Sequence, residues 1–383
     1  MKFRAGAGFA LLVAVLWAVP TARAQTAPLW YDLAPGPHEV GFRRLWELDP
    51  SRVWPRSTAL DSLEGTIARP VRMDAWYPAS CEASQRMPLG SYLQMEAPAH
   101  PFEDVVSLTR AWDEYSYRGL AGDSVAFDRL MRVDTAACLE APAAPGRFPL
   151  VVYSAGWYNR APDNTILAEF LASHGFVVVT VPQLNPGLWT YNFRSDALSV
   201  ENQVRDLEVA LGAMSSEPVV DRRRIAAMGY STGGDVVLLL QGRNPLVRAV
   251  VSLDGSWTLG PDNDVLGSPF FLPDQHRMPI LAARRPTGGM TGADQVLDSL
   301  DAAFRIVVEI PGSDHGSFSD DPAQRRFLGA DVAQQQATHA EVAQTVLEFL
   351  RATLMDSSVP DGAELAQRYR ARGLSVTVRT ASE

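Results

Sequence analysis

Hydrophobic and polar positions between residues 148 and 354 alternate between two kinds of pattern. Short apolar runs typical of buried strands cover residues 150–153, 176–181, 224–228, 249–253, 280–283 and 304–310. Helical spacing of apolar residues covers residues 165–174, 195–214, the segment after Gly233 and residues 333–354. Because such strands alternate with helices, the pattern predicts an α/β fold with a mostly parallel central sheet and helices on both faces.

The chain on either side of this region follows other patterns. Residues 71–77 predict an antiparallel strand near the start of the sheet, whereas residues 84–145 lack regular strand alternation and predict an inserted, partly helical cap. The residues after Val359 form a polar tail whose packing the pattern does not reveal. We expect one large domain over residues 25–383, since an α/β fold with insertions can reach this length.

The first residues have the features of a secretory signal peptide. Lys2 and Arg4 precede an apolar run over residues 9–19, and a small-residue segment follows at residues 22–24. This order predicts a signal peptide over residues 1–24 and a secreted or periplasmic protein. No later stretch approaches the roughly 20 apolar residues that a membrane-spanning helix needs, so we expect no transmembrane segment.

Charge narrows the classes of partner. The formal net charge of −10 falls to about −13 once Lys2, Arg4 and Arg23 are removed with the signal peptide. This balance argues against nucleic acid or an anionic membrane surface as a partner, and the sequence indicates no basic patch.

The chain has two cysteines, Cys81 and Cys138. In an oxidising compartment we expect a disulfide that closes a long loop, with two free buried thiols as the alternative. Neither C-x-x-C spacing nor a Cys/His cluster occurs, so we expect no structural zinc site and no other cofactor.

The strongest chemical motif is GYSTGG at residues 229–234, between the predicted strand at 224–228 and a predicted helix. G-x-S-x-G in this context is typical of a nucleophile elbow, in which a strained turn exposes the serine hydroxyl above the sheet edge. Glycines flank the serine because strand and helix approach too closely for side chains. We therefore expect Ser231 to be a nucleophile.

A serine hydroxyl needs a general base, and in this type of site the base follows the last sheet strand. The chain has six histidines, and His315 lies in the glycine-containing loop PGSDHGSF directly after the strand predicted at residues 304–310. The others lie upstream of the sheet core, at a helix end, before a strand or within the final helix: His38, His100, His174, His276 and His339. We expect His315 to be the base.

Three aspartates could orient this histidine. Asp254 directly follows the strand at residues 249–253, so its carboxylate would emerge at the same sheet edge as Ser231. Asp294 occupies the more common position one strand later, and Asp314 is adjacent to His315. Position alone favours Asp254 and leaves the other two open.

Several segments resemble the platelet-activating-factor acetylhydrolase family, within the dienelactone-hydrolase-like part of the α/β-hydrolases. They are GPHEVG at 36–41, WYP at 76–78, FPLVVYS at 148–154, LASHGF at 171–176 and the motifs around Ser231, Asp254 and His315. The likeness spans residues 36–350 apart from the insertion. It implies an α/β-hydrolase fold, and it implies Asp254 as the acid through the Leu253-Asp254 pair.

The resemblance also indicates where an oxyanion hole would form. Thr232, which follows the nucleophile, would donate one backbone N–H, and Trp157 would donate the second by position. The family's Ser-His-Gly reads Ser-Ala-Gly here, with Ala155 in place of histidine, which puts the geometry of this loop in doubt. Trp157, Tyr158 and Trp189 are candidates for an acyl pocket.

Together these features predict a serine ester hydrolase that forms an acyl-enzyme and needs no metal. The resemblance implies short-acyl esters, including phospholipids with a short or oxidised chain, as small-molecule or lipid substrates. Alternatives are a secreted polyester hydrolase, an acyltransferase, and a non-catalytic binding protein that keeps the fold.

Overall fold

The computed structural model describes residues 27–55, 66–94, 102–157, 162–184, 197–258, 265–288, 294–356 and 362–381. The predicted signal peptide lies outside the described residues. None of the described helices combines the length and apolar character that crossing a bilayer requires.

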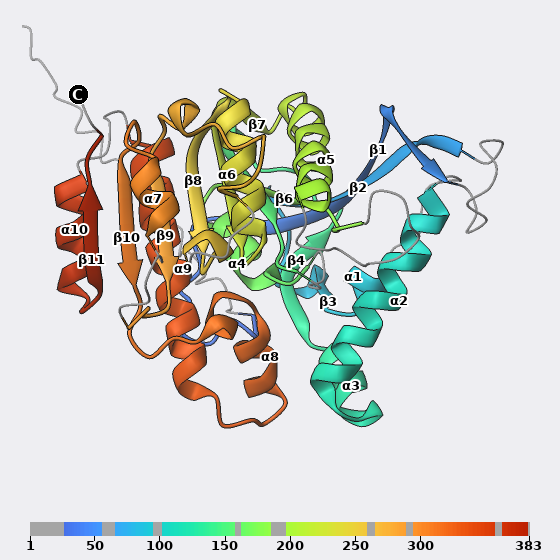
Figure 1. Cartoon of the computed structure of the whole chain (residues 1–383). Helices are drawn as coiled ribbons and strands as arrows, with labels where there is room; N and C mark the ends of the chain where they lie inside the picture. The colour runs from blue at the N-terminus through green and yellow to red at the C-terminus, as the bar shows by residue number, and fades with distance from the viewer. Residues whose placement is uncertain are drawn as a thin grey trace, which may run out of the picture.

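The described strands form one large sheet at the centre of the molecule (Figure 1). In chain order the strands are β1 (Glu39–Pro55), β2 (Thr66–Ala79), β3 (Arg86–Pro88), β4 (Asp134–Leu139), β5 (Phe148–Ser154), β6 (Val177–Thr180), β7 (Val220–Tyr230), β8 (Val247–Leu253), β9 (Ile280–Arg284), β10 (Arg305–Glu309) and β11 (Ser375–Arg379). Their order across the sheet is β11-β10-β9-β8-β7-β5-β6-β2-β1-β4-β3. The strands from β10 to β6 in this order are mutually parallel, and β2 and β11 join them antiparallel. The predicted mostly parallel sheet is confirmed.

Both faces of this sheet are covered. Val151 and Tyr153 of β5 pack into the hydrophobic core on one face, with α4 (Thr165–Ser173) and α9 (Ala333–Leu354). Leu150 and Val152 pack into the core on the other face, with α5 (Ala197–Ser215), α6 (Gly233–Arg243) and α7 (Gln295–Ser299). Successive side chains of a strand point to opposite faces, so a strand buried on both sides must be apolar throughout.

The segment at residues 84–145 differs in part from the expected cap. It contains the helices α1 (Ser91–Gln94), α2 (Phe102–Ala121) and α3 (Ser124–Met131). It also supplies β3 and β4, and β4 pairs with β1 so that the segment extends the sheet. Within the segment, Arg129 of α3 also donates a hydrogen bond to the carbonyl of Phe327, the last residue of α8 (Asp321–Phe327).

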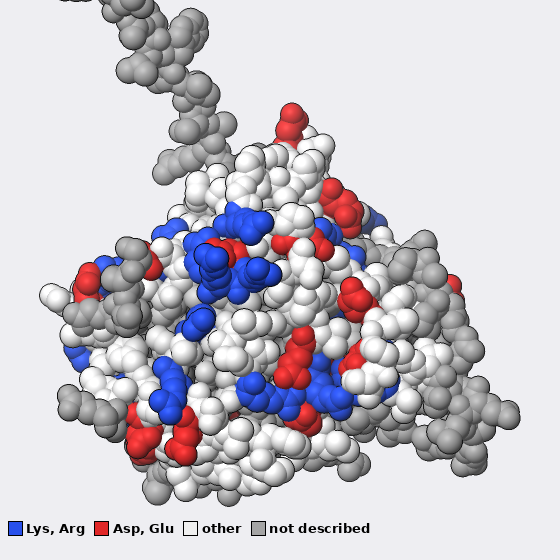
Figure 2. All heavy atoms as spheres, turned by 90° about the horizontal axis from the view of Figure 1, so that it is seen from above, with Lys and Arg blue, Asp and Glu red and all other residues white. Residues whose placement is uncertain are grey.

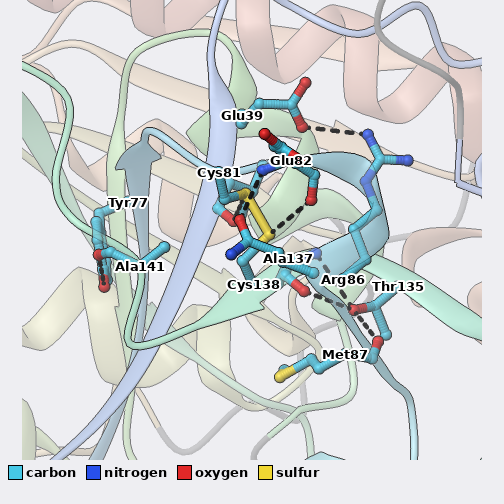
Figure 3. The surroundings of a disulfide bond; sticks show 12 residues. Glu39, Tyr77, Cys81, Glu82, Arg86, Met87, Thr135, Ala137, Cys138 and Ala141 are labelled. Carbon is cyan, nitrogen blue, oxygen red and sulfur yellow. Dashed lines mark hydrogen bonds and ion pairs between the residues drawn. A yellow bond between two sulfur atoms is a disulfide. The ribbon is translucent and has the colours of Figure 1, made fainter.

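A disulfide between Cys81 and Cys138 fixes this segment to the sheet (Figure 3). It joins the residues just after β2 to strand β4, across a sequence separation of 57 residues. An ion pair between Arg86 and Glu39 lies beside it. The structure therefore contains the disulfide expected from the sequence and not the alternative pair of free thiols.

The polar tail is folded as well. It forms α10 (Gly362–Ala371), whose Leu365 and Tyr369 are buried, and strand β11 at the end of the sheet. Val376 and Val378 of β11 pack against the core, and Thr377 between them is polar. The chain therefore closes this side of the sheet with an antiparallel strand.

Arginines gather at the amino ends of the parallel strands, on the face that Figure 2 shows. Exposed arginines just before or at the start of β5, β7 and β8 are Arg147, Arg222, Arg223 and Arg248. These arginines come from segments far apart in the sequence, and acidic side chains lie among the cationic ones on this face. The candidate site lies at the opposite edge.

Candidate active site

Ser231 and Asp254 leave neighbouring strands at the same edge of the sheet. Tyr230, the last residue of β7, lies opposite Leu253, the last residue of β8. The backbone N–H of Ser231 donates to the Leu253 carbonyl at 3.0 Å, so the two turns start side by side. Parallel strands end at one edge, which is why residues 23 positions apart in the sequence become neighbours here.

Both residues have a left-handed backbone. The φ angle is 54° at Ser231 and 46° at Asp254. This region costs a residue with a side chain about 1–2 kcal/mol, and such strain is typical of functional sites that the surrounding structure holds in place. The turn at Ser231 is the strained elbow that the motif predicts.

Close packing explains the glycines around Ser231. A Cβ atom on Gly229 would lie 2.0 Å from the Gly233 carbonyl oxygen, and one on Gly233 would lie 2.2 Å from the Ser154 carbonyl oxygen. Neither neighbour can move, because both are backbone atoms. Helix α6 can therefore approach strands β7 and β5 this closely only with glycine at both positions.

The structure brings the side chains of Ser231, His315 and Asp254 together. His315 Nε2 lies 3.1 Å from Ser231 Oγ, and His315 Nδ1 lies 2.5 Å from Asp254 Oδ2. Asp254 is fully buried, whereas the His315 side chain is 39% exposed. The imidazole therefore bridges a hydroxyl near solvent and a buried carboxylate, an arrangement in which it can accept the hydroxyl proton.

The two alternative aspartates bond elsewhere. Asp294 contacts Arg284 at 2.6 Å and Arg379 at 2.8 Å, and these partners hold its pKa below the usual value despite partial burial. Asp314 accepts hydrogen bonds from the backbone N–H and the hydroxyl of Ser317, so it caps the short helix η5 (His315–Phe318). Asp254 is the aspartate that contacts His315.

Helix α9 contacts the loop that carries His315 through hydrogen bonds to Ser317. Ser317 accepts a hydrogen bond from Thr338 of α9 at 3.0 Å, and the Ser317 carbonyl lies 3.2 Å from Nδ1 of His339. Burial lowers the pKa of His339 to about 4, so this histidine is neutral at ordinary pH. Helix α9 thereby supports the turn from which the His315 ring extends.

Two contacts at this site were not expected from the sequence. The ring of Tyr230 stacks on the imidazole of His315 at 4.9 Å between centroids, and its hydroxyl donates to the His315 carbonyl at 3.0 Å. Arg285 contacts Asp254 twice, through its backbone N–H at 3.0 Å and its guanidinium at 3.2 Å. Their signal in the sequence is position: Tyr230 precedes the nucleophile, and Arg285 directly follows β9, the strand beside β8.

The expected oxyanion donors lie on the elements that the motif predicts. Thr232 is the buried N-cap residue of α6, and Trp157, a residue that is 44% exposed, lies three residues after the end of β5. The carbonyl of Ala155 accepts a hydrogen bond from the buried Gln183 at 2.5 Å, so a side-chain amide anchors this loop. Tyr158 and Trp189, the other candidates for the acyl pocket, lie outside the described residues.

The described residues contain no group of three or more His, Cys, Asp or Glu side chains that could hold a metal ion.

Comparisons with solved structures agree with this architecture. A ferulic acid esterase from Streptomyces cinnamoneus aligns over 88% of this chain and 96% of its own, with a TM-score of 0.59 and 19% identity. At this identity the likeness concerns the fold, and the fold is that of the α/β-hydrolases.

Sequence comparisons identify relatives with a higher sequence identity. "Cutinase 2" from Thermobifida cellulosilytica is 27% identical over 193 residues, which cover 46% of this chain and 68% of that protein. "Cutinase cut1" from Thermobifida fusca has the same identity over 193 residues, and the match spans little more than half of its length, 56%. The model of the dienelactone hydrolase family matches residues 135–354, which is more than half of the chain and includes Ser231, Asp254 and His315. The chain therefore belongs to the dienelactone hydrolase family.

Proposed function

We propose that this protein is a serine hydrolase of carboxylic esters in which Ser231 is the nucleophile, His315 the general base and Asp254 the orienting acid. The observation that carries the proposal is the continuous contact from Ser231 Oγ through the His315 ring to the buried Asp254 carboxylate, at 3.1 Å and 2.5 Å. The similarity to proteins named cutinases supports ester hydrolysis as the reaction class.

In the first half of the reaction Ser231 Oγ attacks the ester carbonyl carbon while its proton passes to His315 Nε2. Asp254 accepts a hydrogen bond from the Nδ1–H group of His315, which selects the tautomer with a free Nε2 and stabilises the imidazolium. The tetrahedral intermediate then breaks its bond to the alkoxy oxygen, which leaves as an alcohol after taking the proton from Nε2. Ser231 now carries the acyl group.

In the second half water attacks the acyl-enzyme while His315 again takes a proton. The second tetrahedral intermediate releases the carboxylic acid, and the proton returns to Ser231 Oγ. In both halves the oxyanion needs donors, and we assign the backbone N–H groups of Thr232 and Trp157 to this role because Thr232 follows the nucleophile and Trp157 follows strand β5.

We further propose that the natural substrates carry short acyl groups, as in esters handled by platelet-activating-factor acetylhydrolases. The cutinase relatives favour a second candidate, a polyester. The two differ in the acyl chain and in the size of the substrate, so a chain-length series separates them.

We also propose that this ester hydrolase is exported from the cytoplasm. The predicted signal peptide over residues 1–24 and the disulfide between Cys81 and Cys138 both support a secreted or periplasmic protein, because disulfides persist in oxidising compartments. We assign residues 25–383 to one domain, since β11 at the end of the chain pairs with the same sheet as β1 near its start.

The test is active-site labelling combined with a substrate series. We expect a fluorophosphonate to label the wild type and not Ser231→Ala, and we expect the wild type to hydrolyse p-nitrophenyl esters with a preference for short acyl chains. A soluble polyester in the same series tests the second candidate, and an added alcohol acceptor tests acyl transfer. A wild type that neither reacts with the label nor hydrolyses any ester contradicts the proposal and favours a binding protein.

A further inference from the structure

We infer that Tyr230 is a positioning residue that holds the His315 ring in line with Ser231 and supports its positive charge during the reaction. This inference rests on the proposed function of the site. Tyr230 precedes the nucleophile in the G-x-S-x-G motif, is 5% exposed, and is the last residue of β7. Its side chain contacts His315 in two independent ways.

The first contact restrains the ring plane. Asp254 and Ser231 bind the two ring nitrogens of His315, so both contacts lie along one axis across the ring and restrain rotation about that axis less than displacement along it. The Tyr230 ring stacks on one face of the imidazole, with 4.9 Å between centroids and 29° between planes. A stacked aromatic ring opposes that rotation, and its electron-rich face attracts the imidazolium that forms when His315 takes the serine proton.

The second contact restrains the backbone. His315 starts a short 3₁₀ helix, and its side chain is 39% exposed, so packing alone does not fix it. The Tyr230 hydroxyl donates to the His315 carbonyl at 3.0 Å. Burial, followed by the nearby carboxylates of Asp163, Asp321 and Asp254, raises the pKa of Tyr230, so the hydroxyl keeps its proton and remains a donor.

Tyr230 and Ser231 are consecutive residues. The strained elbow therefore fixes the nucleophile and, through the preceding side chain, the base that activates it. A displacement of the end of β7 would move Ser231 and, through Tyr230, the His315 ring together, which favours the 3.1 Å distance between Ser231 Oγ and His315 Nε2. Such preorganisation matters because misplacing a reacting group by about 1 Å costs roughly 100-fold in rate.

Two variants separate the two contacts. Tyr230→Leu removes both, and we expect kcat to fall about 10- to 100-fold with KM changed less than about twofold. Without the aromatic face the imidazolium loses support, so the acid limb of the kcat/KM profile should move to lower pH by about half a unit. Tyr230→Phe keeps the ring, and we expect an approximately threefold fall in kcat with the acid limb in place.

Matched controls exist elsewhere in the chain. Tyr77 of β2 donates its hydroxyl to the Ala141 carbonyl at 2.8 Å at the opposite edge of the sheet, so Tyr77→Phe removes the same kind of bond. Tyr369 of α10 is fully buried and donates to the Thr345 carbonyl at 3.2 Å, so Tyr369→Leu removes a comparable ring. Both should lower the unfolding temperature and leave kcat and the pH profile unchanged.

The outcomes are distinct. If Tyr230→Leu keeps the wild-type kcat, or loses kcat no more than Tyr369→Leu with an unmoved acid limb, Tyr230 only fills the core and the inference is wrong. If Tyr230→Leu does not fold, Tyr230→Phe decides, and a kcat equal to that of Tyr77→Phe overturns the inference. Failure of the proposed function looks different, because the wild type itself would then hydrolyse no ester.

Discussion

The guanidinium of Arg285 lies 3.2 Å from Oδ2 of Asp254, the same oxygen that contacts Nδ1 of His315 at 2.5 Å. One buried carboxylate oxygen therefore contacts both the guanidinium cation and the imidazole. The backbone N–H of Arg285 occupies the other oxygen, Oδ1, at 3.0 Å. The three contacts hold the carboxylate in place, and the two from Arg285 reduce the negative charge that His315 experiences.

Removal of this positive charge should change the pH dependence of activity. In Arg285→Gln the Asp254 charge is less compensated and stabilises the imidazolium more strongly, so the acid limb of the kcat/KM profile should move to higher pH by roughly half a unit. Arg285→Lys keeps the charge and should leave the limb near its wild-type position. Equal shifts in both variants would mean that the geometry of the guanidinium, and not its charge, determines the effect.

The choice between the acids is tested by a pair of substitutions. Asp254→Asn should reduce kcat by about 10³- to 10⁴-fold, because an amide cannot hold the productive tautomer of His315. Asp294→Asn breaks contacts with Arg284 and Arg379 on a residue that is 36% exposed, so kcat should stay within about twofold and stability should fall by at most about 1 kcal/mol. Steady-state kinetics and thermal unfolding of both variants measure these effects, and loss of activity only in Asp294→Asn would reverse the assignment.

Within residues 148–354 the hydrophobic pattern predicted the strands and the longer helices. Outside that range it missed β4, although Ala136, Ala137 and Cys138 of this strand are buried. The helix expected at residues 333–354 has the bounds of α9, and each strand expected between residues 150 and 310 is present. The long strand β1 was missed because it mixes arginine, tryptophan and acidic residues and contains a register irregularity between Asp49 and Val53. Strand β11 was missed because its alternation rests on Val376 and Val378 alone.

The same distinction applies to the site. Ser231 was identifiable because the elbow needs glycines at fixed positions, and His315 because it follows the last parallel strand. Tyr230 and Arg285 were not, because their contacts depend on side-chain direction and on the pairing of β8 with β9. Local patterns encode the strained turn and the position of Asp254, whereas the contacts of Tyr230 and Arg285 arise only in the folded structure.

The disulfide should contribute substantially to stability. A bond between Cys81 and Cys138 closes a loop of 57 residues and restricts the unfolded chain. The double variant Cys81→Ala/Cys138→Ala should lose about 3–4 kcal/mol of unfolding free energy. Denaturant unfolding measures the loss, and a reductant should destabilise the wild type but leave the double variant unchanged. Equal stability of the two proteins would show that β4 is held by packing alone.

A buried carboxylate links the sheet, the inserted segment and the chain start. Glu169 of α4 accepts hydrogen bonds from the Trp30 indole at 3.0 Å, the Tyr92 hydroxyl at 2.9 Å and the backbone N–H of Ala136 at 3.0 Å. Burial outweighs these bonds and raises the pKa of Glu169 to about 7. Glu169 therefore keeps its proton to a higher pH in the folded protein than in the unfolded chain.

This shift has a definite sign. A raised pKa in the folded state favours folding below the unfolded pKa, near 4.5, and the contribution is lost as the pH rises through about 7. His174, His276 and His339 oppose this trend because each has a pKa lowered to about 4 in the folded state. The total stability curve therefore mixes the two effects, and a comparison of variants is needed to isolate Glu169.

Glu169→Gln provides that comparison, because the amide keeps the size of the side chain and does not ionise. Between pH 5 and pH 8 the unfolding free energy of the variant should rise by about 2.5 kcal/mol relative to the wild type. Urea unfolding at several pH values measures this difference. Glu208→Gln, in a partly exposed ion pair with Arg243, is the matched control and should show no comparable trend. A constant difference between Glu169→Gln and the wild type would mean that Glu169 stays ionised in the folded protein, with its three donors outweighing burial.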